Sequence, residues 1–143
     1  MIVDNASFFS QVGHFLSSGR EVQLRVAGDS MLPFLADGDC VCLAPVESVT
    51  IKRGDVLLAM WQGRYVLHRV VRMERRQLVL TGDHNLTQLE TVSTDRVLGV
   101  MTVAYRAERV LFRRSAMMRW LGLAWYVIRP GRRVWTKARS LMR

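Results

Sequence analysis

Short segments in which apolar residues alternate with polar ones, or run together, follow one another between residues 21 and 104. Residues 21–26 alternate, as a strand with one buried face would, and the later segments are mostly apolar runs of strand length. The Gln62-Gly63 pair separates two of them and is typical of a β-hairpin turn. The pattern predicts a mainly β, compact antiparallel fold, with strands at residues 21–26, 40–44, 56–61, 65–73, 77–81 and 97–104.

A segment with helical periodicity precedes these strands. Its spacing predicts an amphipathic helix over residues 5–18, and Gly19 follows at the position where a helix C-terminus favours glycine. The apolar positions of this helix are Phe8, Val12, Phe15 and Leu16.

The chain beyond residue 105 has a different character. Residues 113–128 carry an apolar stripe at helical spacing that Arg129-Pro130-Gly131 ends, and residues 132–143 suit a second, short basic helix. A length of 143 residues indicates one domain. We divide it into a β domain with its N-terminal helix, residues 1–105, and a basic amphipathic helical tail, residues 106–143.

The positive charge of the chain is concentrated in that tail. Residues 1–105 contain ten Lys and Arg against eleven Asp and Glu (net −1), whereas residues 106–143 contain eleven against one (net +10). A basic segment of this kind indicates an anionic partner. Interleaved aromatic residues suit an anionic membrane surface, with packing on the β domain or a dimer contact as alternatives, and nothing specific points to nucleic acid. These aromatic residues are Trp120, Trp125, Tyr126 and Trp135.

Targeting signals and cysteines indicate the compartment. The N-terminus lacks the basic and apolar regions of a secretory signal, and no run of about 18 apolar residues is present. Cys40 and Cys42 are the two cysteines, too few for a disulfide framework or a metal site. We therefore expect a cytoplasmic protein, able to attach peripherally to a membrane, that needs no metal or other cofactor.

Three residues offer the chemistry of a serine peptidase. Ser30 lies in a turn-forming stretch with Gly28 and Pro33, which can point its hydroxyl outward. A serine needs a base to take its proton, and His68 is a competent one because imidazole titrates near pH 6.5. Asp83 could accept a hydrogen bond from the imidazole. Each residue also has a plain structural interpretation, as a turn serine, a core histidine and a turn aspartate.

The neighbours of Ser30 complete the expected site. We expect the backbone amide of Ser30 to be the main donor to a developing oxyanion, with Gly28 shaping the turn. Met31 and Pro33 follow directly in the chain, and we expect them to contact the substrate.

Taken together, the motifs resemble those of the signal peptidase I superfamily, which includes the self-cleaving repressors of the SOS type. They span residues 26–100 in the family's order. The resemblance implies a peptidase fold of the signal-peptidase type with Ser30 as nucleophile and His68 as general base. The matching motifs are Gly-Asp-Ser-Met-Leu-Pro at 28–33, Asp-Gly-Asp at 37–39, Arg-Gly-Asp-Val at 53–56, His-Arg-Val at 68–70 and Gly-Asp-His-Asn at 82–85.

The residue before Arg69-Val70 separates two branches of that superfamily. The bacterial leader-peptidase branch has a lysine there, whereas His68 is similar to the endoplasmic-reticulum and sporulation-type enzymes, which use Ser, His and Asp. The resemblance implies Asp83 as the acid that orients His68. Glu90 is a poorer match, and Asp95 lies further along the chain.

These features predict a serine endopeptidase that cleaves a leader, signal or pro-segment from a peptide or protein. Two alternatives are a non-catalytic module that binds a peptide or partner and a self-processing regulator. The only Ala-Gly bond, Ala27-Gly28, lies in the turn of the nucleophile rather than in a linker, which argues against self-cleavage of the repressor type.

Overall fold

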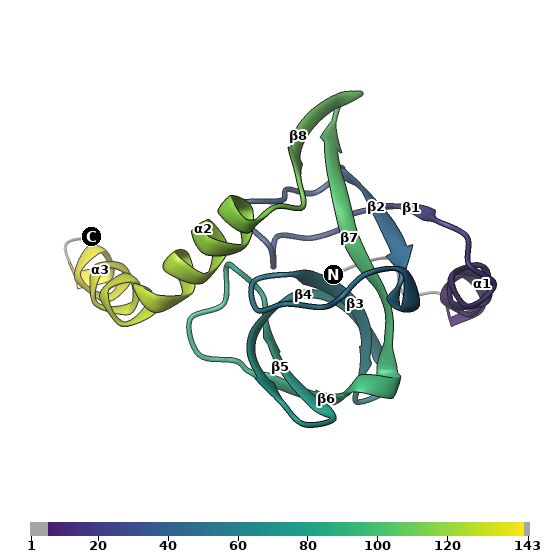
Figure 1. The fold of residues 1–143 in the computed structure, drawn as a ribbon. Helices are drawn as coiled ribbons and strands as arrows, with labels where there is room; N and C mark the ends of the chain where they lie inside the picture. The colour runs from purple at the N-terminus through teal and green to yellow at the C-terminus, as the bar shows by residue number, and fades with distance from the viewer. Residues whose placement is uncertain (1–5, 142–143) are drawn as a thin grey trace.

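A curled antiparallel β-sheet forms the body of the protein (Figure 1). The computed structural model describes residues 6–141. The strands lie in the order β1-β2-β7-β3-β4-β5-β6, and β8 pairs with β7. The strands are β1 Val22–Arg25, β2 Cys40–Pro45, β3 Val56–Trp61, β4 Arg64–Glu74, β5 Gln77–Thr81, β6 Glu90–Ser93, β7 Val97–Arg106 and β8 Arg109–Arg113. The helices are α1 Ala6–Ser17, α2 Ala116–Val127 and α3 Arg129–Leu141, with short 3-10 turns at Val46–Ser48 and Thr94–Arg96. The predicted mainly β, antiparallel fold is confirmed.

The β3–β4 hairpin follows directly from the local sequence. Trp61 pairs with Arg64 across a two-residue turn, and the turn residues Gln62 and Gly63 have φ angles of 49° and 74°. Two consecutive positive φ angles characterise the type I′ turn, whose twist matches that of the strands. The predicted hairpin is confirmed, and β3 and β5 begin and end at the predicted residues.

Both faces of β3 are buried, which accounts for its unbroken apolar run. Val56 and Leu58 belong to a core cluster that also contains residues of α1, β1 and β2. Leu57 and Ala59 point the other way, into a second cluster formed by residues of β3, β4, β5, β6 and β7. Because side chains alternate along a strand, a strand between two cores needs apolar residues at every position.

Helix α1 covers one side of the sheet, away from α2 and α3 (Figure 1). Val12 and Leu16 are buried in the first core cluster, whereas Phe15, predicted for the same apolar stripe, is largely exposed. The side chain of Phe8 lies outside the described residues. The helix ends as expected at Gly19, whose φ of 88° lets Arg20 N–H donate to Phe15 O at 3.0 Å.

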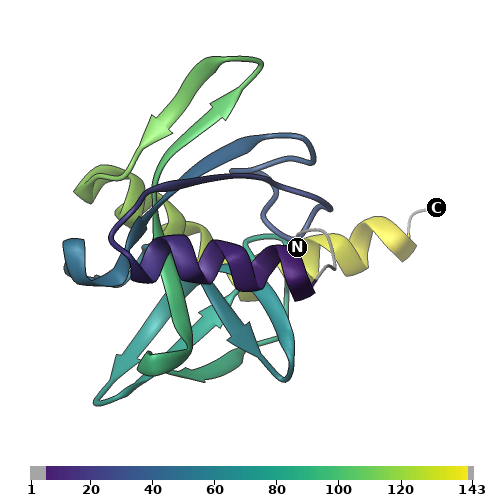
Figure 2. The same cartoon turned by 90° about the vertical axis from the view of Figure 1, so that its right-hand side faces the viewer.

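The predicted helical tail begins later than expected. Strand β7 continues to Arg106, and residues 109–113, expected to belong to the tail, form β8 and extend the sheet. The resulting β7–β8 hairpin projects beyond the rest of the molecule (Figure 2). The two tail helices form, but α3 already begins at Arg129, so that Arg129-Pro130-Gly131, predicted as a break between them, is its first turn. Ser115 caps α2 by accepting a hydrogen bond from Met118 N–H at 3.1 Å.

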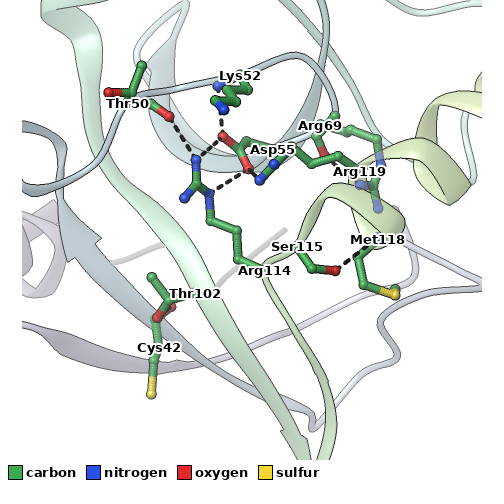
Figure 3. A network of polar contacts seen from close by, with 11 residues as sticks. Cys42, Thr50, Lys52, Asp55, Arg69, Thr102, Arg114, Ser115, Met118 and Arg119 are labelled. Atoms are coloured by element: carbon green, nitrogen blue, oxygen red, sulfur yellow. Dashed lines mark hydrogen bonds and ion pairs between the residues drawn. The ribbon is translucent and has the colours of Figure 1, made fainter.

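Asp55 connects β8 and α2 to the sheet (Figure 3). Its buried carboxylate accepts two hydrogen bonds from Arg114, at 2.7 and 2.9 Å, and lies 3.7 Å from Arg119. Gly54 has a φ of 94°, and a Cβ there would lie 2.7 Å from the Arg119 carbonyl oxygen. The Arg-Gly-Asp-Val motif is thus explained by packing: the glycine lets α2 approach and the aspartate holds it.

Cys40 and Cys42 are both free thiols and are half-buried. No helix within residues 6–141 combines the length and the apolarity needed to cross a bilayer.

Candidate active site

Ser30 lies in the loop that joins β1 to β2, and two aspartates and two apolar side chains hold this loop. Asp37 accepts from Gly28 N–H at 2.8 Å, and Asp39 accepts from Ala36 N–H at 2.8 Å. Met31 and Leu35 are buried in the first core cluster. With its neighbours fixed on both sides, the half-buried Ser30 is presented on a well-defined turn.

His68 lies within reach of that serine, in the middle of β4. The His68 side chain is buried, and Leu57 of β3 is its cross-strand partner. Its Nε2 atom is 3.2 Å from Ser30 Oγ. This distance fits a hydrogen bond between a serine and its base. The structure therefore brings together the predicted nucleophile and the predicted base, which are 38 residues apart in the chain.

The other nitrogen of His68 contacts Glu90, the first residue of β6. Nδ1 lies 2.9 Å from both carboxylate oxygens, and the Glu90 side chain is completely buried. A carboxylate can only accept, so we assign the ring proton to Nδ1, which leaves Nε2 to accept from the Ser30 hydroxyl. Gln88 Nε2 donates to Glu90 Oε1 at 3.1 Å and orients the carboxylate further.

Asp83, the expected orienting acid, contacts a different partner. Its carboxylate accepts two hydrogen bonds from Arg69, at 2.7 and 2.8 Å. Burial raises the pKa of the Asp83 carboxyl, and the two hydrogen bonds from Arg69 oppose that rise. Asp95, the other alternative, accepts a hydrogen bond from Ser93 at the surface. The acid that contacts His68 is thus Glu90, which the family resemblance made a poorer match than Asp83.

The register of three strands explains why Glu90, and not Asp83, contacts His68. Cross-strand neighbours point to the same face of a sheet, and Val70 of β4, Leu80 of β5 and Glu90 of β6 are such neighbours. His68 lies two residues before Val70 and shares its face, so Glu90 and His68 are on one side. Arg69 pairs with Thr81 and points to the opposite face, toward which Asp83 also points.

The turn after β5 packs directly against the nucleophile. His84 N–H donates to the carbonyl oxygen of Ser30 at 3.0 Å. A Cβ on Gly82 would lie 2.5 Å from that oxygen and 3.1 Å from His68 Nε2. The Gly-Asp-His-Asn motif therefore forms a wall of the site: its glycine permits the close approach, and its aspartate anchors the turn to Arg69.

The remaining predicted site residues have separate positions. The Gly28 N–H is engaged by Asp37, and its φ of 88° supports the predicted role in the turn. Met31 has 1% of its surface exposed and belongs to the core, which leaves its side chain no surface for a substrate. Pro33 is exposed. Across residues 6–141 there is no group of three or more His, Cys, Asp or Glu side chains able to hold a metal ion.

The tail helices contact the loop that joins the site turn to Glu90. Trp125 Nε1 and Arg132 Nη2 donate to the Asp83 carbonyl oxygen, at 2.8 and 2.7 Å. The Arg132 guanidinium also stacks over the Trp125 ring, 4.1 Å from its centroid. Arg129 binds the carbonyl oxygens of residues 86 and 88, the latter at 3.1 Å. Part of the tail therefore packs on the β domain and supports one wall of the site.

One comparison with known proteins identifies a family for the chain. A model of the Peptidase S24-like family matches residues 8–102, about two thirds of the chain, from α1 into β7. The match includes Ser30, His68 and Glu90. A comparison with curated proteins finds no significant match. The chain, with its curled antiparallel sheet and its serine and histidine in contact, belongs to the Peptidase S24-like family.

Proposed function

We propose that this protein is a serine endopeptidase of the signal-peptidase type, in the branch whose base is histidine. The observation that carries the proposal is the continuous Ser30–His68–Glu90 chain, with 3.2 Å from Oγ to Nε2 and 2.9 Å from Nδ1 to the carboxylate. Serine needs a base to become a nucleophile, and a base needs an acceptor that fixes its tautomer and orientation. All three are buried or half-buried and meet at one point.

The mechanism assigns one role to each residue. Ser30 Oγ attacks the carbonyl carbon of the substrate while its proton moves to His68 Nε2. Glu90 stabilises the resulting imidazolium through Nδ1–H, and His68 then donates the proton from Nε2 to the leaving amine, so that an acyl-enzyme forms. Water activated by His68 hydrolyses this ester and regenerates Ser30. The backbone amide of Ser30 remains the proposed oxyanion donor.

The proposed substrate is a peptide or protein in which a leader, signal or pro-segment precedes the cut. The support for this substrate class is the resemblance to signal peptidases. Within that superfamily, His68 stands where leader peptidases carry a lysine, which favours the histidine branch. We propose an extended segment with small side chains near the scissile bond, as substrates of that superfamily have.

The test uses the purified chain and a mixture of unstructured peptides, with cleavage sites determined by mass spectrometry. We expect cleavage by the wild type, loss of cleavage in Ser30→Ala and His68→Gln, and unchanged cleavage in Ser10→Ala, an exposed serine of α1. A serine-directed phosphonate should label the wild type but not Ser30→Ala. Cleavage that persists in Ser30→Ala, or absence of both cleavage and labelling in the wild type, would favour the non-catalytic binding module.

A self-processing regulator is the second candidate, because the matching family model is compatible with it. Incubation of the purified chain alone distinguishes the two. Fragments that form at a rate independent of protein concentration, and not in Ser30→Ala, would assign the site to cleavage of its own chain. We expect the chain to stay intact.

A further inference from the structure

Helix α2 has two faces with different surroundings. Its inner face packs on the β domain so tightly that a Cβ on Gly122 would lie 2.2 Å from the Arg69 guanidinium carbon. Trp125, on the same side, donates to the Asp83 carbonyl oxygen. Both contacts come from the inner face, which attaches the helix to the domain.

The outer face of α2 is apolar and open. Trp120 has 66% of its surface exposed and Ile128, at the end of the helix, has 51%. The exposed apolar residues are three, four and seven positions apart, which places them on one side of a helix. They are Met117, Trp120, Leu121, Val127 and Ile128. We call this set the outer stripe.

The outer stripe continues onto α3. Trp135 of α3 has 62% of its surface exposed and lines a groove with Ile128, at the side where the groove also meets Trp125, Arg132 and His84. Exposed tryptophans on two consecutive helices form an apolar surface of the kind that marks an interaction site rather than the surface of a soluble monomer. Tryptophan is also the residue that concentrates at the boundary between water and lipid.

The charges around the outer stripe have one sign. Residues 109–143 contain ten Lys and Arg and no Asp or Glu. Arg114 and Arg119 form ion pairs with Asp55. Lys137 and Arg139 of α3 are exposed and form no ion pair with any residue of the described range 6–141. Arg139 follows Trp135 by four positions and lies on the same side of α3, so this side combines an uncovered tryptophan with a positive charge.

We propose that the outer stripe of α2 and the adjoining face of α3 dock on the surface of an anionic lipid bilayer. Apolar side chains enter the interfacial layer while basic residues contact the headgroups, as in amphipathic helices that lie in the membrane plane. A nucleic acid would use the positive charge but not the aliphatic residues, and a second copy of the chain would bring the same positive charge to the contact. The bilayer uses both features.

Docking in this way would bring the peptidase site to the membrane surface. Trp125 and Arg132, from the two docking helices, both bind the carbonyl oxygen of Asp83, next to the glycine that touches Ser30 and His68. The proposal itself does not depend on catalysis, since lipid binding can be measured with the Ser30→Ala chain.

The test is co-sedimentation of the 143-residue Ser30→Ala chain with vesicles of phosphatidylcholine, with or without phosphatidylglycerol. We expect binding to the anionic vesicles and a blue shift of tryptophan emission. Adding Trp120→Glu and Ile128→Glu should weaken binding by roughly tenfold or more, because both charges would have to enter the interface. Lys137→Glu with Arg139→Glu should weaken it as well, and added salt should do the same.

Met73→Glu is the matched control, since Met73 is an exposed apolar residue of β4 outside the tail. It should bind vesicles like the parent chain, and thermal unfolding should show that all variants fold. Equal binding by the Trp120→Glu, Ile128→Glu chain would reduce the interaction to charge alone and overturn the proposal. Absence of vesicle binding would also overturn it, and self-association lost in the same variant would then assign the face to a second copy.

Discussion

His68 and Arg69 are consecutive residues of β4, yet their side chains point to opposite faces of the sheet and each holds a different buried carboxylate. His68 contacts Glu90 at 2.9 Å, and Arg69 contacts Asp83 at 2.7 Å. One pair forms part of the proposed catalytic chain and the other fixes the turn that packs against Ser30. Replacing Glu90 should therefore change the catalytic rate, and replacing Asp83 should change the stability of the fold.

Replacing Glu90 should impair catalysis. Glu90→Gln removes the charge that stabilises the imidazolium and allows His68 to adopt the wrong tautomer, so we expect kcat to fall by about 10²–10⁴-fold. KM should change little, because Glu90 is buried behind His68. The measurement is a comparison of kcat and KM with the wild type. Activity within a factor of about two of the wild type would remove Glu90 from the mechanism.

Replacing Asp83 should instead affect folding. Asp83→Asn leaves the buried Arg69 guanidinium without its counter-charge, and breaking a buried ion pair costs about 3–5 kcal/mol of unfolding free energy. Urea unfolding of Asp83→Asn and Glu90→Gln, side by side, measures the difference. If Asp83→Asn were as stable as the wild type but inactive, Asp83 would have a direct part in the chemistry.

Gly82 should be sensitive to the smallest substitution. A Cβ at this position would lie 2.5 Å from the Ser30 carbonyl oxygen, so Gly82→Ala has to displace the nucleophile turn or the histidine. A misplacement near 1 Å at reacting groups costs about 10²-fold in rate. We expect a loss of kcat/KM of that order. Gly131→Ala is the control, because a Cβ at Gly131 has no atom within 4 Å among the described residues, and it should leave kcat/KM unchanged.

Asp39 should make the stability of the nucleophile loop depend on acid pH. Hydrogen bonds from Arg106 hold the pKa of Asp39 below its usual value of 3.8. In the folded state the carboxyl therefore stays ionised to lower pH than in the unfolded chain. Its contribution to stability is fully present above about pH 4 and is lost as the pH falls through the lower, folded-state pKa.

The measurement is the unfolding free energy of the wild type and Asp39→Asn from pH 7 down to pH 2. We expect Asp39→Asn to be less stable at pH 7 and the gap to close below about pH 4. Glu47→Gln, at an exposed position, serves as the control. A gap that stays constant over the whole range would show that the ion pair with Arg106 contributes nothing to stability.

Much of the fold could be predicted because its signals are local. The bounds of β3 and β5, the Gln62-Gly63 hairpin and the end of α1 at Gly19 depend on the residues that form them and their immediate neighbours. The strands that were missed, β6 and β8, are short and rich in polar or charged residues. Glu90 and Val92 are buried in β6 while Thr91 and Ser93 are exposed, a weak alternation over four residues.

Ser30 and His68 could be recognised as a pair from the sequence because each lies in a distinctive motif and the two motifs keep their order. The acid could not be recognised in the same way. Asp83 has the better motif, but the choice between Asp83 and Glu90 depends on which face each strand presents after β4, β5 and β6 are aligned. A shift of one residue in register would reverse the faces.

In the tail, too, tertiary contacts decide what the sequence leaves open. Its composition alone indicated both an apolar helix and a strong positive charge, and left membrane binding and packing as alternatives. The tertiary structure separates two faces of α2: one contacts Arg69 and Asp83, and the other, which we propose for the bilayer, is left uncovered. Local sequence determines which segments form strands, turns and helices, through backbone preference and periodicity. Which charges meet, and which apolar face stays open, depends on contacts between segments far apart in the chain, and only the folded structure decides them.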